Sequence, residues 1–346
     1  MRGASIVLAM LVAACGGGDD DDGGGDPGSG TDGGGDRADA ADTGGRVLAD
    51  EYPGDDGIGE DPAVVWFEAF DAASVDAVTA RYDQAQGQPR MELVSDQPTG
   101  AAGSAAMAMT AGQGVDAVDL YKMLPDHEEL WVRWYAKYQP DVPWHHSGMW
   151  FGGYNPPMPY PSPMAGISPD GDDRFSLSIE PIWQDPELRF DFYAYWMRMH
   201  SWMEEPFPPD DGTAYYGNSM IHANDFTVDE GTWVCLEVHV RLNDDLASSG
   251  GALLEVWKDD ARVVRFDDGG PMGYWIRDKF CPESTDGAEC TDYPAPADEV
   301  LDLQFRTTAD LALNAFWPQN YITDDAMGTL TFDQMVVATR RVGCLR

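Results

Sequence analysis

The chain has 346 residues, 61 of them acidic and 21 basic, which gives a formal net charge of −40. Residues 62–346 alone carry 46 acidic and 18 basic side chains, a net charge of −28. A surface so negative repels phosphate backbones, so the charge argues against nucleic acid and other polyanions as partners.

The first fifteen residues, MRGASIVLAMLVAAC, predict an export signal at residues 1–14. One Arg precedes an apolar run that is too short to span a membrane as a mature helix, and small residues follow it. The ending Val12-Ala13-Ala14-Cys15 resembles the lipobox of bacterial lipoproteins. We therefore expect a protein anchored to the bacterial envelope, at the outer membrane or cell surface, through lipidated Cys15.

Residues 15–61 are composed mainly of Gly, Asp and Ala. Such a segment has little to bury and repels itself, so it is predicted to be a disordered tether. Residues 62–346 contain 12 Trp and many Val, Leu, Phe and Tyr, enough for the core of a single domain.

Most of residues 62–346 alternate apolar and polar side chains, the pattern of half-buried strands. SVDAVTARY spaces its apolar residues as one short helix, and GALLEVWKDDARVVRF predicts a hairpin that turns at Asp259-Asp260. The other predicted strands, in chain order, are AVVWFEAF, LWVRWYAKY, ELRFDFYAYW, TWVCLEVHVRLN, VLDLQFR and LTFDQMVVATRRVG. This order predicts an all-β fold, an antiparallel β-sandwich with one short helix and long loops.

Four cysteines remain in the exported domain once Cys15 is set aside. An even number in an exported protein favours disulfides. CPESTDGAEC is a turn-rich loop whose ends can meet, which predicts a bridge between Cys281 and Cys290 and leaves Cys235 and Cys344 as a second pair. No CxxC spacing occurs, so these thiols do not indicate a metal site.

Four segments resemble successive strands of concanavalin A-like jelly rolls, in the branch that contains alginate-lyase-type polysaccharide lyases. They are ELWVRWYAKYQPDVPW, GTWVCLEVHVRLN, GALLEVWKDDARVVRF and FDQMVVATRRVG. The resemblance implies a polysaccharide partner held on the polar face of a curved sheet. Two features depart from it: Met149 stands where the lyases carry Lys, and the ExDxxE strand of related glucanases is absent.

The polar positions of the predicted strands suggest a basic, tyrosine-rich groove for a sugar acid. For β-elimination on a uronate, Arg241 or Arg133 would stabilise the developing charge, His239 would take the proton, and Tyr195 or Tyr135 would protonate the leaving oxygen. The other residues expected to contact the glycan are Glu237, Lys137, Arg189, Tyr193, Gln304, Arg306, Trp144, Trp150 and Trp202. The alternative is that these polar positions are scattered, solvated strand faces.

Three classes of function stay open: a lyase-like enzyme, a lectin-like module that binds glycan without catalysis, and a structural envelope or adhesion protein. No cofactor is expected, and no motif indicates the structural calcium ion that the fold would permit. His145-His146 and the Met-rich run that follows residue 196 contain soft ligands, but Met more often fills gaps in packing, so no metal is predicted. We expect a monomer.

Overall fold

The computed structural model describes residues 46–112, 117–159, 165–184, 187–200, 215–221, 223, 225–267, 273–276, 279–282, 301–322 and 326–346. The signal at 1–14, the lipidation residue Cys15, Trp202 and the Cys281–Cys290 bridge lie outside the part whose side chains are described. Within the described ranges, no helix is long and apolar enough to cross a membrane.

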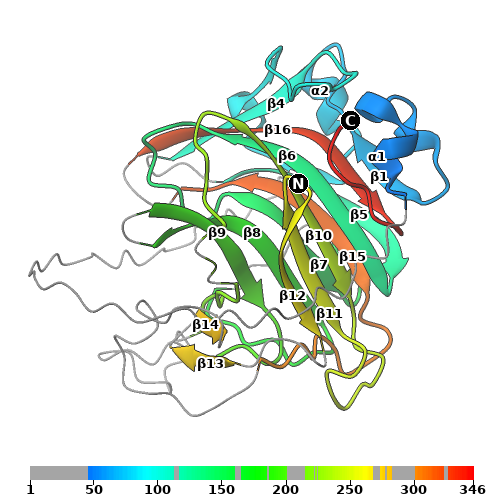
Figure 1. Ribbon diagram of the computed structural model, residues 1–346, viewed down its shortest axis with the longest axis vertical. Helices are drawn as coiled ribbons and strands as arrows, with labels where there is room; N and C mark the ends of the chain where they lie inside the picture. Colours follow the sequence, from blue (N-terminus) through cyan, green and yellow to red (C-terminus); the bar gives the residue numbers. More distant parts are fainter. Residues whose placement is uncertain are drawn as a thin grey trace, which may run out of the picture. The chain divides into compact units, whose positions relative to one another are not determined.

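Two antiparallel sheets pack face to face, which confirms the predicted all-β sandwich (Figure 1). One is an eight-stranded sheet in the order β12-β11-β10-β6-β16-β4-β3, with β1 also paired to β16. Its strands are β1 Val64–Glu68, β3 Met91–Val94, β4 Ala106–Gly112, β6 Glu129–Tyr138, β10 Trp233–Arg241, β11 Leu253–Lys258, β12 Ala261–Asp267 and β16 Met327–Ala338.

The second is a six-stranded sheet in the order β2-β5-β15-β7-β8-β9. Its strands are β2 Gln84–Gln86, β5 Val118–His127, β7 Gly148–Tyr154, β8 Arg174–Gln184, β9 Glu187–Tyr195 and β15 Leu313–Asn320. A separate two-stranded sheet joins β13 Gly273–Ile276 to β14 Lys279–Pro282. The main core cluster contains the inward-facing side chains of both large sheets, for example Val238 of β10 and Phe192 of β9.

Two local predictions are confirmed by the backbone. The predicted helix is α2 Val75–Thr79, and the Ser74 hydroxyl accepts a hydrogen bond from the Ala77 N–H at 3.2 Å, as an N-cap does. Asp259 and Asp260 join β11 to β12 with φ of 50° and 66°. Positive φ at both central residues is the type I′ geometry, which suits Asp and matches the twist of a hairpin.

The domain starts earlier than predicted, because residues 46–61 fold onto it rather than belonging to the tether. They form α1 Leu48–Glu51 and two 3-10 turns, η1 Pro53–Asp55 and η2 Ile58–Glu60. Leu48 and Ile58 are fully buried in a second core cluster with Val342 of the C-terminal segment. These few apolar residues suffice to dock an otherwise acidic segment.

The predicted strand at 300–306 is wrong. Leu301–Arg306 form no strand, although Leu303 and Phe305 are buried as their alternation predicts. The amide oxygen of Asn243 accepts hydrogen bonds from the backbone N–H groups of Phe305 and Arg306 at 3.0 and 3.1 Å. A side chain thus satisfies the backbone groups that a neighbouring strand would otherwise bond.

The predicted pairing of Cys235 with Cys344 is confirmed, and it joins β10 to the C-terminal segment across 109 residues. We expect the Cys235→Ala/Cys344→Ala variant to lose about 2–4 kcal/mol of unfolding free energy, because a long loop is no longer closed in the unfolded chain. Urea unfolding in non-reducing buffer measures the loss. A midpoint equal to that of the wild type would show that the bridge adds no stability.

Candidate functional site

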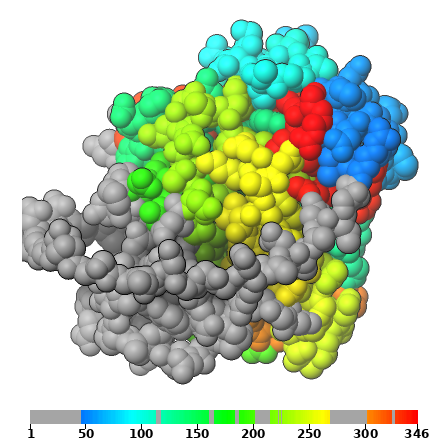
Figure 2. Space-filling view, viewed as in Figure 1, coloured from blue at the N-terminus to red at the C-terminus, as the bar shows by residue number. Residues whose placement is uncertain are grey.

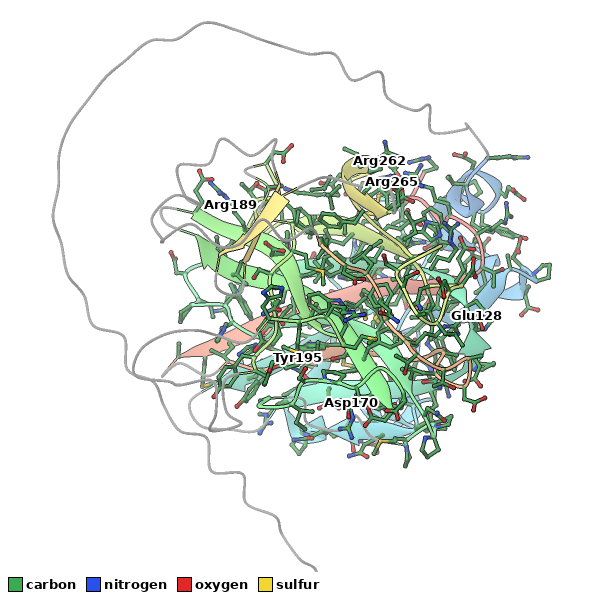
Figure 3. All side chains as sticks on the ribbon, turned by 90° about the horizontal axis from the view of Figure 1, so that it is seen from below. Glu128, Asp170, Arg189, Tyr195, Arg262 and Arg265 are labelled. Carbon is green, nitrogen blue, oxygen red and sulfur yellow. A yellow bond between two sulfur atoms is a disulfide. The ribbon has the colours of Figure 1, made fainter. Side chains whose placement is uncertain are left out.

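The sequence-predicted site residues do not meet in one groove. The polar side chains at alternate positions of β10 belong to the eight-stranded sheet and point away from the core. Arg189, Tyr193 and Tyr195 belong to β9 of the six-stranded sheet. In Figure 3, Arg189 and Tyr195 lie at opposite ends of β9. The prediction of a single groove lined by both sets is therefore wrong.

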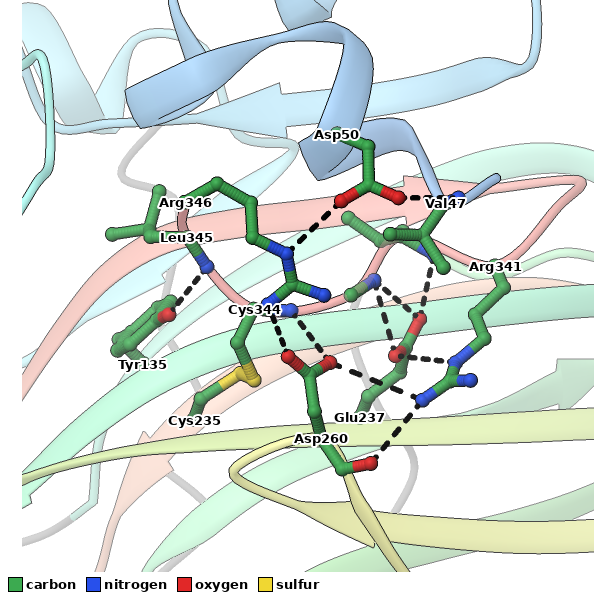
Figure 4. A network of polar contacts seen from close by, with 12 residues as sticks. Val47, Asp50, Tyr135, Cys235, Glu237, Asp260, Arg341, Cys344, Leu345 and Arg346 are labelled. Carbon is green, nitrogen blue, oxygen red and sulfur yellow. Dashed lines mark hydrogen bonds and ion pairs between the residues drawn. A yellow bond between two sulfur atoms is a disulfide. The ribbon is translucent and has the colours of Figure 1, made fainter. Parts of the chain in front are cut away.

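Residues 46–61 and the C-terminal segment cover the outer face of β10 and β6. The Glu237 carboxylate accepts hydrogen bonds from the N–H groups of Val342 and Gly343 at 2.7 and 3.3 Å, and the Tyr135 hydroxyl accepts one from the Leu345 N–H at 2.8 Å (Figure 4). Figure 2 shows the N-terminal residues, in blue, against the C-terminal ones, in red. The Glu237 carboxylate thus holds the C-terminal segment and is not available to a glycan.

Arg133 and His239, expected to act in catalysis, are both held by carboxylates of the protein. Arg133 is completely buried and binds the Asp55 carboxylate at 2.5 Å and the Gln334 carbonyl at 2.7 Å. His239 stacks on Trp131 with ring centroids 3.8 Å apart.

Both ring nitrogens of His239 contact carboxylates: Nδ1 lies 2.9 Å from Glu255 and Nε2 lies 2.6 Å from Glu129. Glu255 also binds Arg262 and Arg265, which lie next to each other on β12 (Figure 3). Because neither nitrogen is left for a substrate proton, the predicted role of His239 as a base is wrong.

The remaining basic and amide residues of the prediction brace loops. Arg241 donates to the Gly251 carbonyl at 2.7 Å, and Lys137 pairs with Asp96 at 2.7 Å. Arg306 donates to the carbonyls of Asn243 and Leu311 and pairs with Glu128, while Gln304 accepts from Arg198 and donates to the Leu246 carbonyl. Trp144 is also misassigned, because it is buried in the core against Tyr138.

The outer face of the six-stranded sheet instead carries an aromatic row that crosses five strands, from β5 to β9. Trp150 of β7 pairs with Trp317 of β15 and with Ser178 of β8, and Ser178 pairs with Tyr193 of β9. Tyr121 of β5 extends the row, with its ring 5.5 Å from that of Trp317. The Trp150 and Trp317 rings are stacked at 5.7 Å with 12° between their planes. Flat rings in this arrangement offer a platform for another ring.

A polar row runs beside the aromatic one. Gln319 of β15 pairs with Asp119 of β5 and with Gly148 of β7, and Glu180 of β8 pairs with Asp191 of β9. The alternation in RFSLSIE produces this arrangement, because Phe175, Leu177 and Ile179 face the core and send the intervening polar residues outward.

His146, just before β7, is positioned at the end of this polar row. Its Nδ1 lies 3.2 Å from the Glu180 carboxylate, and its ring meets that of Tyr193 edge-on at 4.8 Å. The His146 backbone has φ of 58°, a region that non-glycine residues rarely occupy. Such strain is kept where the surrounding contacts demand one side-chain position.

Two tyrosines complete the cluster. The hydroxyls of Tyr193 and Tyr195 lie 3.2 Å apart. Burial raises the pKa of Tyr195 to about 12 and raises the pKa of Tyr193 well above its usual value of 10. Both hydroxyls therefore keep their protons at neutral pH and serve as hydrogen-bond donors or general acids.

Among the residues that the structure describes, Asp119 Oδ1, Tyr121 OH, Trp150 Nε1 and Ser176 Oγ are buried on this face without a hydrogen-bond partner. Buried polar groups are nearly always paired, because an unpaired one forfeits its hydration. Four of them on one face indicate a surface completed by water or by a polar ligand.

The sequence analysis assigned Tyr193, Tyr195 and Trp150 to a glycan site, and they do share this face. It missed His146, Glu180, Trp317 and Tyr121. RFSLSIE is a short alternating strand signal that would have placed Glu180 outward, whereas nothing local distinguishes His146 from His145. Within the described ranges, no group of three or more His, Cys, Asp or Glu side chains suits a metal ion.

No protein-family model and no curated protein matches the chain. Among solved structures it is similar to the alginate lyase Aly36B, at 10% identity and a TM-score of 0.49 over 82% of this chain and 99% of that one. It is also similar to the PL-14 alginate lyase from Aplysia kurodai, at 13% identity and a TM-score of 0.49 over 80% and 99% of the two chains. A third similar structure is the endo-β-1,4-glucuronan lyase from Trichoderma reesei, at 13% identity and a TM-score of 0.40 over 80% of this chain and 96% of that one.

These neighbours are polysaccharide lyases, the kind of protein that the strand motifs resemble. At such identities and TM-scores the likeness transfers no residue role, so the chemistry has to come from the side chains of this chain.

Proposed function

We propose that the outer face of the six-stranded sheet binds a polysaccharide and cleaves it by β-elimination at a uronate unit. One observation carries the proposal: the Tyr193 ring contacts both His146, of the acid–base cluster, and Trp150, of the aromatic row. The acid–base cluster and the aromatic platform are therefore in contact. The unpaired Trp150 Nε1 and Ser176 Oγ beside it suit sugar hydroxyls.

The roles follow from which atoms are already engaged. Glu180 holds His146 through Nδ1, so the proton at C5 of the uronate passes to Nε2. The electron pair left at C5 forms the C4–C5 double bond as the C4–O bond breaks. Tyr195, supported by the Tyr193 hydroxyl, donates the proton that the leaving oxygen requires.

A second candidate, glycan binding without catalysis, is favoured by the charge of this face. Asp119, Glu180 and Asp191 lie in its polar row, and the described strand arginines of the same outward parity, Arg174 and Arg189, stand towards the ends of β8 and β9. Carboxylates accept hydrogen bonds from the hydroxyls of neutral sugars, whereas a uronate needs a neutralising partner for its own carboxylate.

One experiment separates these functions. The exported domain, residues 46–346, is incubated with alginate, glucuronan and a neutral β-glucan, and both unsaturated-uronate absorbance and binding are recorded. Absorbance with either uronate polymer supports the lyase, and binding without absorbance supports the lectin-like module. A domain that neither binds nor cleaves any of them would contradict both and leave a structural envelope role.

We also propose that the protein is exported and held on the envelope by lipidated Cys15, as the sequence before the tether suggests. The Cys15→Ala variant should leave the membrane fraction, because a single unlipidated tether has nothing to bury in a bilayer. Fractionation of cells that produce each form measures this. Full retention of the variant in membranes would contradict lipid anchoring.

A further inference from the structure

Asp119 and Tyr121 form a pair on β5 that the proposed elimination does not use. Asp119 is 3% exposed and Tyr121 is fully buried, yet Asp119 Oδ1 and the Tyr121 hydroxyl have no hydrogen-bond partner. Both residues lie on the outer face, since Asp119 pairs with Gln319 and the Tyr121 ring packs against Trp317.

An unpaired buried carboxyl group and an unpaired buried hydroxyl, two residues apart on one strand, are costly to keep. Burial raises the pKa of Asp119 to about 7, so this group is partly charged at neutral pH with no cation to offset it. A ligand that hydrogen-bonds both groups would remove that cost.

The position of the pair sets its distance from the acid–base cluster. From β5 to β9 the sheet order crosses β15, β7 and β8, which makes four strand spacings. At about 4.8 Å each, they separate Tyr121 from Tyr193 by roughly 19 Å. One sugar ring cannot reach both places, but an oligosaccharide laid along the aromatic row can.

We infer that Asp119 and Tyr121 form a second sugar-binding subsite, which accepts the hydroxyls of a unit several positions away from the one that reacts. Trp317 supplies the apolar surface of the subsite, and the Asp119 carboxylate supplies a charge-assisted acceptor. The inference rests on the proposed function, because it requires a glycan on this face.

The test compares oligosaccharide probes of two lengths. In the His146→Ala background, which prevents turnover, binding of alginate and glucuronan oligosaccharides of two and six units is measured by calorimetry. We expect Asp119→Asn and Tyr121→Phe each to weaken binding of the six-unit probes at least fivefold and to leave the two-unit probes unchanged. The matched control is Tyr82→Phe, which removes another buried, unpaired hydroxyl, beside Trp66.

The pH dependence adds an independent readout. A sugar hydroxyl favours the charged form of Asp119, so six-unit affinity should rise as pH increases towards about 7 and then level off. The Asp119→Asn variant should lose that rise. Because every unit of these probes carries its own carboxylate, comparison with Asp119→Asn isolates the contribution of Asp119. An affinity that falls with pH in the parent but not in Asp119→Asn would overturn the inference.

Two results distinguish the failures. If both variants bind the six-unit and the two-unit probes as tightly as the His146→Ala parent does, the subsite is overturned and the proposed function is not. A parent that binds neither length of either probe would overturn the proposed function and the subsite together.

Discussion

Replacing His146 with alanine should lower the elimination rate by about 10²- to 10⁴-fold, the usual contribution of a positioned general base. The reason is geometric: Glu180 holds Nδ1, which leaves Nε2 to take the proton, and alanine removes the acceptor. Binding of a polysaccharide should change far less, because the aromatic platform stays in place. Initial rates of unsaturated-uronate formation measure the effect.

His239→Ala is the matched control, because it removes a histidine that also contacts glutamates but on the opposite sheet. It should lower stability and leave the rate per folded molecule near that of the wild type. Equal losses of rate in both variants, with folding confirmed by circular dichroism, would contradict the assignment of the base.

Arg133→Ala should destabilise the fold by about 3–5 kcal/mol, the cost of leaving one partner of a buried ion pair alone. Asp55 is 2% exposed, and its carboxylate has Arg133 as its ion-pair partner, at 2.5 Å. The variant also loses the hydrogen bond to the Gln334 carbonyl. Equilibrium unfolding in urea measures the change.

Lys137→Ala provides the comparison on the same strand and the same face. Its partner Asp96 is 55% exposed, so solvent screens the pair and the expected change is about 0–1 kcal/mol. The double variant Asp55→Asn/Arg133→Met should recover much of the loss, because it removes both charges and Asn tolerates the φ of 64° at position 55. Similar costs for Arg133→Ala and Lys137→Ala would show that burial of the pair does not matter.

Local chemistry made seven of the sixteen strands in the described ranges, and one hairpin turn, predictable. Period-2 alternation located β6, β9, β10 and β16, and the Asp259-Asp260 pair located a hairpin, because both signals depend on neighbours within a few residues. The segment at 300–306 shows where this reasoning fails. Its alternation predicts burial of Leu303 and Phe305, but Gln304 and Arg306 are buried as well. Strand formation also needs a partner, and the side chain of Asn243 takes that place.

The candidate site was predictable only in part, because alternation tells which residues share a face but not what covers that face. Glu237 and His239 do point outward from β10 as predicted. Residues 46–61 and the C-terminal segment, more than 100 positions away in sequence from Glu237, cover that surface, and the C-terminal segment binds Glu237. No signal within the strand distinguishes this from an open groove.

Pairing between strands decided which polar residues meet. Tyr193 meets His146 and Glu180 because β9 lies beside β8 and β8 beside β7, an order that depends on long-range contacts. Tyr193 and Tyr195 share one face, as the alternation of β9 predicts, but the sequence pattern combined them with residues of the other sheet.

The central claim is that glycan binds the outer face of the six-stranded sheet. Trp150 and Trp257 test it most directly, since they are 7% and 5% exposed and belong to opposite sheets. Affinities of Trp150→Leu and Trp257→Leu for whichever polysaccharide the wild type binds are measured under conditions where both variants are folded. We predict at least a tenfold loss, about 1.4 kcal/mol, for Trp150→Leu and wild-type affinity for Trp257→Leu. Loss of affinity in Trp257→Leu with full binding by Trp150→Leu would contradict the claim.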